Sequence, residues 1–145
     1  MNRHGANISP KIGEIYLMQF NGCGSEQCGI RPGLVFQNNT GNLYSPNIIA
    51  LPLSSAVKKV RQPTHVLLLA KETGLKMDSI VICENPERMS KERIGRFIAE
   101  LPEKDMKRVA KASLLATSAI SFLDLESLVM VWEAAKDLNR SKART

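Results

Sequence analysis

The chain has 145 residues, with 20 Lys and Arg against 14 Asp and Glu and a net charge of +6 at pH 7. This length suits one ordinary domain with a short extension, and it can bury a core without disulfides. The positive charge favours anionic partners but by itself points only weakly to nucleic acid. No apolar window of about 18 residues is present, and residues 1–10 lack the layout of a secretion signal. These features argue against a membrane protein and predict a cytoplasmic one.

The first part of the chain, to about Glu84, is predicted to be rich in β-strands. Short runs of branched and aromatic residues alternate there with turn-forming segments. The expected strands are Glu14–Phe20, Leu34–Gln37, Asn47–Ser54, Thr64–Leu69 and Ser79–Glu84. No segment between them is long enough for the crossover helix of a parallel sheet, so we expect antiparallel pairing in a small barrel or sandwich. Pro52 predicts that the third strand is an edge strand or contains a bulge.

From about Ser90 the hydrophobic period lengthens to about 3.6 residues, which predicts helices. Ser90 is expected to cap a short helix, and residues 97–101 either continue it or form a last strand. A longer helix is expected after Pro102 and a final one from near Asp124. The final helix carries an apolar stripe of Leu125, Leu128, Val129, Trp132 and Ala135. This stripe predicts packing on the core, on a second subunit or on a partner protein.

A glycine-flanked loop between the first two strands concentrates groups that can bind an anion. The loop, Gly24–Pro32, contains Glu26 and Arg31 together with several amide and hydroxyl donors. Pro32 disfavours helical backbone at Arg31, so the guanidinium is expected at the start of a strand. There it can hold a phosphate or a carboxylate with two parallel N–H donors. The alternative is an ion pair between Glu26 and Arg31 across the loop.

Histidine and metal chemistry are less favoured by the residues present. His4 lies in a terminus that we expect to be loose, and a structural role is expected for His65 at the start of a strand. Together with His65, the three cysteines Cys23, Cys28 and Cys83 do not match the spacing of a zinc site, so we expect neither a metal nor a cofactor. Three cysteines cannot all pair with one another, and none forms a C-x-x-C unit, so a reducing compartment is the simpler fit.

Five short motifs follow one another along the chain, at Glu14–Tyr16, Gly24–Pro32, Gln37–Pro46, Gln62–Val66 and Gly74–Ser79. In this order they resemble the MazF/PemK family of toxin ribonucleases, and the resemblance covers about residues 10–120. It implies a mainly β fold with C-terminal helices, built as a small SH3-like β-barrel of the MazF/PemK and CcdB-like type. We expect residues 1–120 to form the toxin domain. Residues 121–145 are expected to form a helical extension that is not an independent domain.

The resemblance also implies a function and partners. The chain would be the toxin of a type II toxin–antitoxin system, a metal-independent and sequence-specific endoribonuclease. It would cleave single-stranded mRNA to 2′,3′-cyclic phosphate and 5′-hydroxyl ends, act as a homodimer and pair with a cognate antitoxin that covers its RNA groove. Two alternatives stay open: a non-catalytic toxin of the same fold that binds a protein such as DNA gyrase, and a regulatory RNA-binding barrel.

The resemblance makes Arg31 and Ser54 the central catalytic residues. Ser54 stands where the family has threonine; it keeps the hydroxyl donor and loses the methyl group that stiffens the rotamer. Cys28 stands where the family has glycine or another small residue. Without a metal, the 2′-hydroxyl of the RNA is the nucleophile, so the protein must accept its proton and stabilise a more negative phosphorane. Arg31 suits the stabilisation, and Glu26 is expected either to accept the proton or to orient Arg31.

Polar side chains near this site are the expected contacts with single-stranded RNA, which proteins read by stacking and by hydrogen bonds to base edges. Because aromatic residues make up only 5 % of the chain, we expect amides and hydroxyls to supply most of the specificity. The expected RNA-binding residues are Ser25, Gln27, Gln37, Asn38, Asn39, Ser55, Gln62 and Thr64, with Lys58, Lys59 and Arg61 on phosphates. The alternative for each is ordinary turn or surface chemistry.

Overall fold

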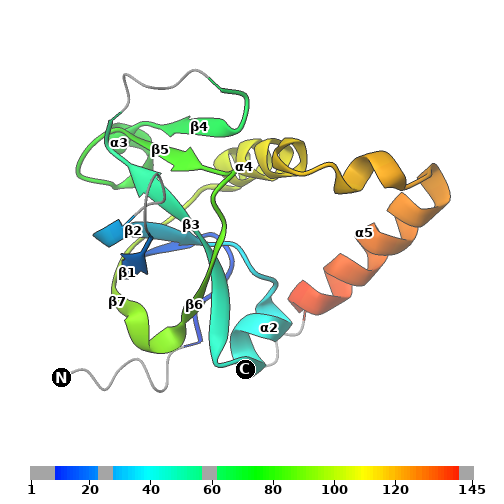
Figure 1. Ribbon diagram of the computed structural model, residues 1–145, viewed down its shortest axis with the longest axis horizontal. Coiled ribbons are helices and arrows are strands. Elements are labelled where there is room, and N and C mark those ends of the chain that lie inside the picture. Colours follow the sequence, from blue (N-terminus) through cyan, green and yellow to red (C-terminus); the bar gives the residue numbers. More distant parts are fainter. Residues whose placement is uncertain (1–8, 23–27, 57–61, 141–145) are drawn as a thin grey trace.

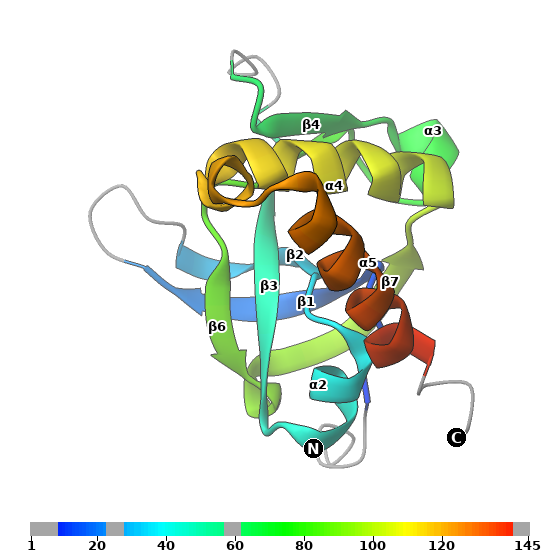
Figure 2. The same cartoon turned by 90° about the vertical axis from the view of Figure 1, so that its right-hand side faces the viewer.

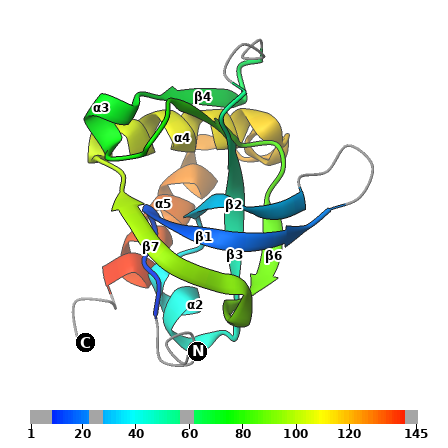
Figure 3. The same ribbon diagram turned by 90° about the vertical axis from the view of Figure 1, so that its left-hand side faces the viewer.

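The computed structural model describes residues 9–22, 28–56 and 62–140, which form an antiparallel sheet with helices mainly after it (Figure 1). Its strands are β1 (Glu14–Asn21), β2 (Cys28–Val35), β3 (Asn47–Ser54), β4 (His65–Leu68), β5 (Ser79–Ile82), β6 (Glu87–Ser90) and β7 (Ile94–Glu100). The strand order is β4-β5-β3-β2-β1-β7, and β6 also pairs with β3. Figure 3 shows β1, β2 and β7 crossing β3 steeply, so that the sheet curls in a barrel-like manner. The predicted mainly β fold is confirmed.

The two longest helices follow the strands, as the change of hydrophobic period predicts, whereas two short helices lie between strands. The helices are α2 (Asn39–Tyr44), α3 (Ala70–Thr73), α4 (Glu103–Ala116) and α5 (Leu125–Arg140), with 3₁₀ turns η2 (Lys91–Arg93) and η3 (Ala119–Phe122). The side chain of Ser90 accepts a hydrogen bond from the Glu92 N–H at 3.2 Å, which confirms its capping role. Of the two alternatives for residues 97–101, the strand is correct, because they lie largely in β7.

The sheet buries two hydrophobic clusters on opposite faces. In β1, Ile15 enters one cluster while Tyr16, Met18 and Phe20 enter the other, as the two-residue period of a strand requires. Helix α4 covers the first cluster and contributes the fully buried Val109 (Figure 2). One face of β1 is therefore packed along its length, and Ile15 anchors the other face at its start, which makes this strand a firm support for β2 and β7.

The third strand differs from its prediction. Strand β3 pairs with β2 on one side and with β6 and then β5 on the other, so the expectation of an edge strand was wrong. The Phe36 N–H donates to the Ile49 carbonyl at 2.9 Å, and the antiparallel alternation then turns the nitrogen of Pro52 away from β2. On the other side, pairing with β6 ends at Ala50 and pairing with β5 begins at Leu53. Pro52 thus occupies the gap in which a missing N–H costs no ladder bond.

The segment Asn38–Asn42, which reads as a cluster of turn formers, begins a helix instead. Asn38 caps α2, its side-chain oxygen accepting a hydrogen bond from the Gly41 N–H at 2.8 Å. An asparagine side chain, which favours turns, can therefore also accept a hydrogen bond from a backbone N–H in the first turn of a helix. Strand β6 was not predicted, because its four residues lack a clear apolar alternation.

Helix α5 begins away from the body of the protein, beyond η3, and approaches it only at its own end, near α2 (Figures 1 and 2). It has no buried residue among those described, and Trp132 is 61 % exposed. Its last turn is fixed to α2, where the Thr40 hydroxyl donates to the Leu138 carbonyl at 2.6 Å. The expectation that its stripe packs on the chain's own core was therefore wrong. No helix of the described residues is long and apolar enough to cross a membrane.

The two-cluster core makes a direct stability prediction. Replacing Leu68 with alanine removes a fully buried side chain of β4 and should lower the free energy of unfolding by about 2–5 kcal/mol. Replacing Leu115, which is 65 % exposed on α4, is the matched control and should change it by less than about 0.5 kcal/mol. Urea unfolding of both variants measures the difference, and equal losses would contradict the described packing.

Candidate active site

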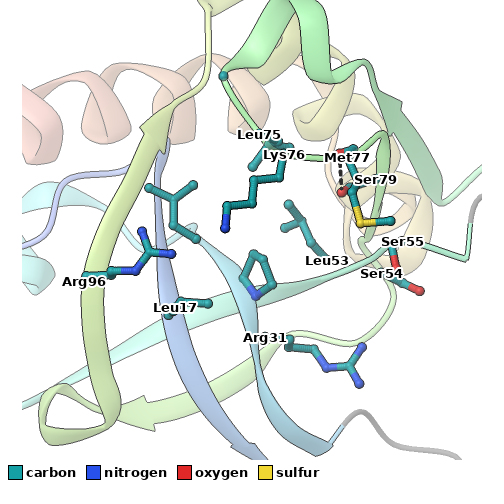
Figure 4. A pocket seen from close by; sticks show the side chains of 13 residues that line it. Leu17, Arg31, Leu53, Ser54, Ser55, Leu75, Lys76, Met77, Ser79 and Arg96 are labelled. Atoms are coloured by element: carbon teal, nitrogen blue, oxygen red, sulfur yellow. Dashed lines mark hydrogen bonds between the residues drawn. The ribbon is translucent and has the colours of Figure 1, made fainter.

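A cavity of about 550 Å³ opens beside the central strands, at the end of the sheet near α3 (Figure 4). Strands β1, β2, β3 and β7 contribute to it, as does the segment between α3 and β5. The lining residues are Leu17, Arg31, Pro32, Leu53, Ser54, Ser55, Gly74, Leu75, Lys76, Met77, Ser79, Arg96 and Ile98. It is large enough for part of a ligand rather than for a single ion or water molecule.

The floor of the cavity is apolar and is set by strand register. Pro32 of β2 lies opposite Leu17 of β1, and continuing the β2–β3 register by one residue brings Pro32 level with Leu53. Cross-strand neighbours of this kind point to the same face of a sheet. Leu53 is 1 % exposed and belongs to the first core cluster, so the floor is continuous with the packed interior.

Arg31 and Ser54 come to the same cavity, as the sequence predicts. Arg31 directly precedes Pro32 on β2, and Ser54 directly follows Leu53 on β3. Continuing the β2–β3 register by one more residue therefore brings Arg31 level with Ser54. The guanidinium donates from Nε and Nη2 to the Cys28 carbonyl at 3.3 and 3.1 Å. Its Nη1 group has no partner among the described residues. The Ser54 hydroxyl oxygen accepts from the Ala56 N–H at 3.1 Å, which leaves its proton free to be donated.

Two further cations line the cavity, and sequence reasoning missed both. Lys76 lies between α3 and β5, and Arg96 lies on β7; both are exposed. With Arg31 they give the cavity three positive charges, and no Asp or Glu is among its described lining residues. A cavity of this composition attracts anions. Lys76 falls within the Gly74–Ser79 motif, which could have suggested it, whereas no sequence signal marks Arg96.

Several predicted residues lie outside the part of the chain that the structure describes. They are Ser25, Glu26 and Gln27 of the first loop and Lys58, Lys59 and Arg61 of the loop after β3. The role of Glu26 as proton acceptor or as partner of Arg31 therefore stays a prediction. The same holds for the phosphate contacts assigned to the three basic residues.

The predicted RNA contacts Gln37, Asn38 and Asn39 do not line the cavity. Asn39 is buried, and its side-chain oxygen accepts a hydrogen bond from the Ile12 N–H at 2.8 Å. Gln37 donates to the Asn47 carbonyl at 3.1 Å, and Asn38 caps α2. Figure 1 shows α2 far from α3, at the other end of β3. The structure thus uses these three side chains to hold α2 in place, and the cavity forms without them.

The remaining predicted contacts divide between the cavity and its surroundings. Ser55 lines the cavity and is exposed. Gln62 and Thr64 are not among its lining residues, and the Thr64 hydroxyl lies 3.4 Å from the Gln62 side-chain oxygen. Of the eight amide and hydroxyl residues that the sequence suggests for RNA, only Ser55 is placed at this cavity within the described segments.

His65 has the structural role that the sequence predicts, and it does not line the cavity. Its Nε2 lies 3.0 Å from the Glu84 carboxylate, and its side chain is only 11 % exposed. Burial acts to raise the pKa of Glu84, but hydrogen bonds from Thr64, from its own backbone and from His65 outweigh this and lower that pKa. Burial raises the pKa of Cys83 to about 11, so this thiol is a poor nucleophile at neutral pH.

Comparison with known proteins identifies the family of the chain. Residues 11–115 match the family model of the PemK-like, MazF-like toxins of type II toxin–antitoxin systems, and the chain belongs to this family. Endoribonuclease EndoA of Bacillus subtilis is 34% identical over 113 residues, which cover 77% of this chain and 97% of that protein. Endoribonuclease MazF of Staphylococcus saprophyticus is 37% identical over 101 residues, covering 69% and 84%.

Solved structures show the same fold. MazF from Deinococcus radiodurans (Form-I) aligns with a TM-score of 0.65 at 23% identity, over 74% of this chain and 96% of that one. A mycobacterial endoribonuclease solved in complex with its cognate antitoxin aligns with a TM-score of 0.57 at 22% identity, over 74% and 92%. The barrel-like arrangement of the strands is therefore that of the MazF toxins.

The Glu84–His65 pair makes the acid stability of the fold depend on one carboxylate. A lowered pKa in the folded state means that Glu84 contributes stability above its ordinary value of 4.5, and that this contribution is lost as the pH falls through the lowered value. Glu84→Gln should therefore destabilise the protein at about pH 7, and this loss of stability should become progressively smaller as the pH falls below 4.5. Denaturant unfolding across this range measures the trend, with the exposed Glu126→Gln as a control. A pH-independent loss would contradict the assignment.

Proposed function

We propose that the chain is a toxin endoribonuclease that cleaves single-stranded mRNA at this cavity. The observation that carries the proposal is that Arg31 and Ser54 meet at one end of a cavity whose described charged residues are all cationic. A phosphodiester backbone is the polyanion that such a lining suits. Family membership and the two endoribonuclease relatives support the same conclusion.

The proposed cleavage proceeds without a metal, by attack of the RNA's own 2′-hydroxyl on the adjacent phosphorus. The new bond closes a 2′,3′-cyclic phosphate, and the bond to the 5′-oxygen breaks and leaves a 5′-hydroxyl after protonation. Arg31 places donors on the non-bridging oxygens, which become more negative in the phosphorane, while Ser54 donates one further hydrogen bond. Glu26 accepts the 2′-hydroxyl proton or orients Arg31. Arg31 itself is not the base, because guanidinium keeps its proton at neutral pH.

The partners and organisation follow from the same proposal. The solved structures that this chain resembles include MazE–MazF of Deinococcus radiodurans, and we propose that this chain likewise binds a cognate antitoxin and forms a homodimer. The toxin domain comprises residues 1–120 and the extension residues 121–145, which is supported by the end of the family match at residue 115. Action on mRNA places the protein in the cytoplasm.

The proposal predicts cleavage of a mixed single-stranded RNA pool in the presence of EDTA. Product ends should be 2′,3′-cyclic phosphate and 5′-hydroxyl, and mapping them should reveal a short preferred sequence. Arg31→Ala should abolish cleavage, because the phosphorane loses its charged donors. The free energy of unfolding and the mass of the oligomer should stay unchanged. Ser54→Ala should lower the rate roughly 10²–10³-fold, as expected for the loss of one well-placed donor.

Ser54→Thr is the matched control for the hydroxyl and should retain most of the activity. Cleavage that requires added magnesium would contradict the proposed chemistry, and full activity in Arg31→Ala would contradict the site. Binding of DNA gyrase without any RNA cleavage would instead favour the non-catalytic toxin, and tight RNA binding without products would favour a regulatory barrel.

A further inference from the structure

We propose that Lys76 and Arg96 form a second anion site, which binds a phosphate of the same RNA strand on the other side of the apolar floor from Arg31. The inference rests on the proposed function and extends it. Arg31 and Ser54 hold the phosphate that is cut, and Lys76 and Arg96 hold a neighbouring phosphate. The nucleotide between them lies over Leu17, Pro32 and Leu53.

Strand order separates the two groups of cations. Arg31 lies on β2 and Arg96 on β7, and β1 runs between these strands. Two interstrand spacings place the backbones of β2 and β7 roughly 10 Å apart. Because arginine and lysine side chains are long enough to span this distance, the direction in which they point decides whether the cations share one phosphate. Figure 4 draws Arg31 and Ser54 at one end of the cavity and the other two cations at the opposite end, so that two separate phosphates suit them.

An irregularity in β7 helps to place Arg96 at the cavity. Tyr16 pairs with Phe97 and Met18 pairs with Ile94, so Leu17 alone faces both Gly95 and Arg96. This two-against-one count is a β-bulge, a feature that redirects side chains and is common beside functional sites. Gly95 accommodates the close approach, because a Cβ at this position would lie 3.2 Å from the Leu17 carbonyl oxygen.

The charges of Lys76 and Arg96 have no partner in the described part of the chain. Neither makes a hydrogen bond or an ion pair there, in contrast with Arg108, whose Nη1 lies 3.0 Å from the Asp105 carboxylate. Figure 4 shows the charged ends of Lys76 and Arg96 turned toward one another. Two like charges that converge without a carboxylate repel each other, and an anion between them relieves that repulsion.

The floor between the two ends favours a nucleotide as the occupant. The half-buried Leu17 and Pro32 present apolar surface, with the buried Leu53 packed beneath them, and this surface suits the face of a base or the carbon side of a ribose. An acidic protein segment would also bring anions to the cations. RNA is favoured because the cavity is continuous with Arg31 and Ser54, where the cleaved phosphate lies in the proposed function.

The test measures binding separately from cleavage. The probe is the RNA sequence identified by end mapping, synthesised with a single 2′-deoxy residue before the scissile phosphate, so that the nucleophile is absent. Its dissociation constant is measured over a series of salt concentrations for the wild type, for Lys76→Ala/Arg96→Ala and for Lys107→Ala/Lys111→Ala. The last variant removes the same charge from exposed positions on α4 outside the cavity.

Loss of one phosphate contact should reduce the slope of log K against log salt by about 0.7 for a single strand. We expect this change in the Lys76→Ala/Arg96→Ala variant, together with a higher KM and a retained kcat. We expect the wild-type slope in the α4 variant. The reduced slope with retained kcat would support the inference.

An unchanged slope, in a wild type that binds and cleaves RNA, would overturn the inference and leave the proposed function standing. A wild type that neither binds nor cleaves RNA would overturn both. Weaker binding of poly-glutamate in the Lys76→Ala/Arg96→Ala variant, with an unchanged RNA slope, would assign the cations to an acidic protein segment and also overturn the inference.

Discussion

The pairing of β2 with β1 on one side and with β3 on the other is the constraint on which the site depends. Its register places Pro32 opposite Leu17 of β1 and, continued past the Gly33–Pro52 pair, brings Pro32 level with Leu53 and Arg31 level with Ser54. Both strands that flank β2 are anchored in the hydrophobic clusters, so the two catalytic candidates are carried on rigid elements. A shift of one residue in either ladder would turn the floor residues to the opposite face and separate the hydroxyl from the guanidinium.

The electrostatics of the cavity follow from which elements reach it. No described carboxylate lines the cavity, and two that are partly or fully buried pair with other cations, Glu84 with His65 and Asp105 with Arg108. The cations Arg31, Lys76 and Arg96 are left at the cavity without carboxylates in its described lining. The core thus supplies the shape of the cavity, and the unneutralised cations supply its preference for a polyanion. Neither property alone would point to RNA.

The fold was more predictable from the sequence than the site. Strand β3 was predicted with its observed bounds because its apolar run ends in turn formers, whereas the helix at Asn39–Tyr44 begins with residues that also favour turns. Arg31 and Ser54 were predicted as site residues from local motifs and family resemblance, and both line the cavity. Arg96 was not, because its position at the cavity depends on a bulge between two strands far apart in sequence. Asn39 was predicted to contact RNA because the sequence does not show whether an asparagine side chain is buried or exposed.

The claim that RNA lies in this cavity is tested most directly by mapping backbone amide chemical shifts when a non-cleavable, 2′-deoxy-substituted RNA is added. The account predicts that the largest changes occur at the described lining residues, from β2 and the end of β3 through residues 74–79 to residues 96–98 of β7. Changes confined to α2 or α5, with the cavity residues unaffected, would contradict it.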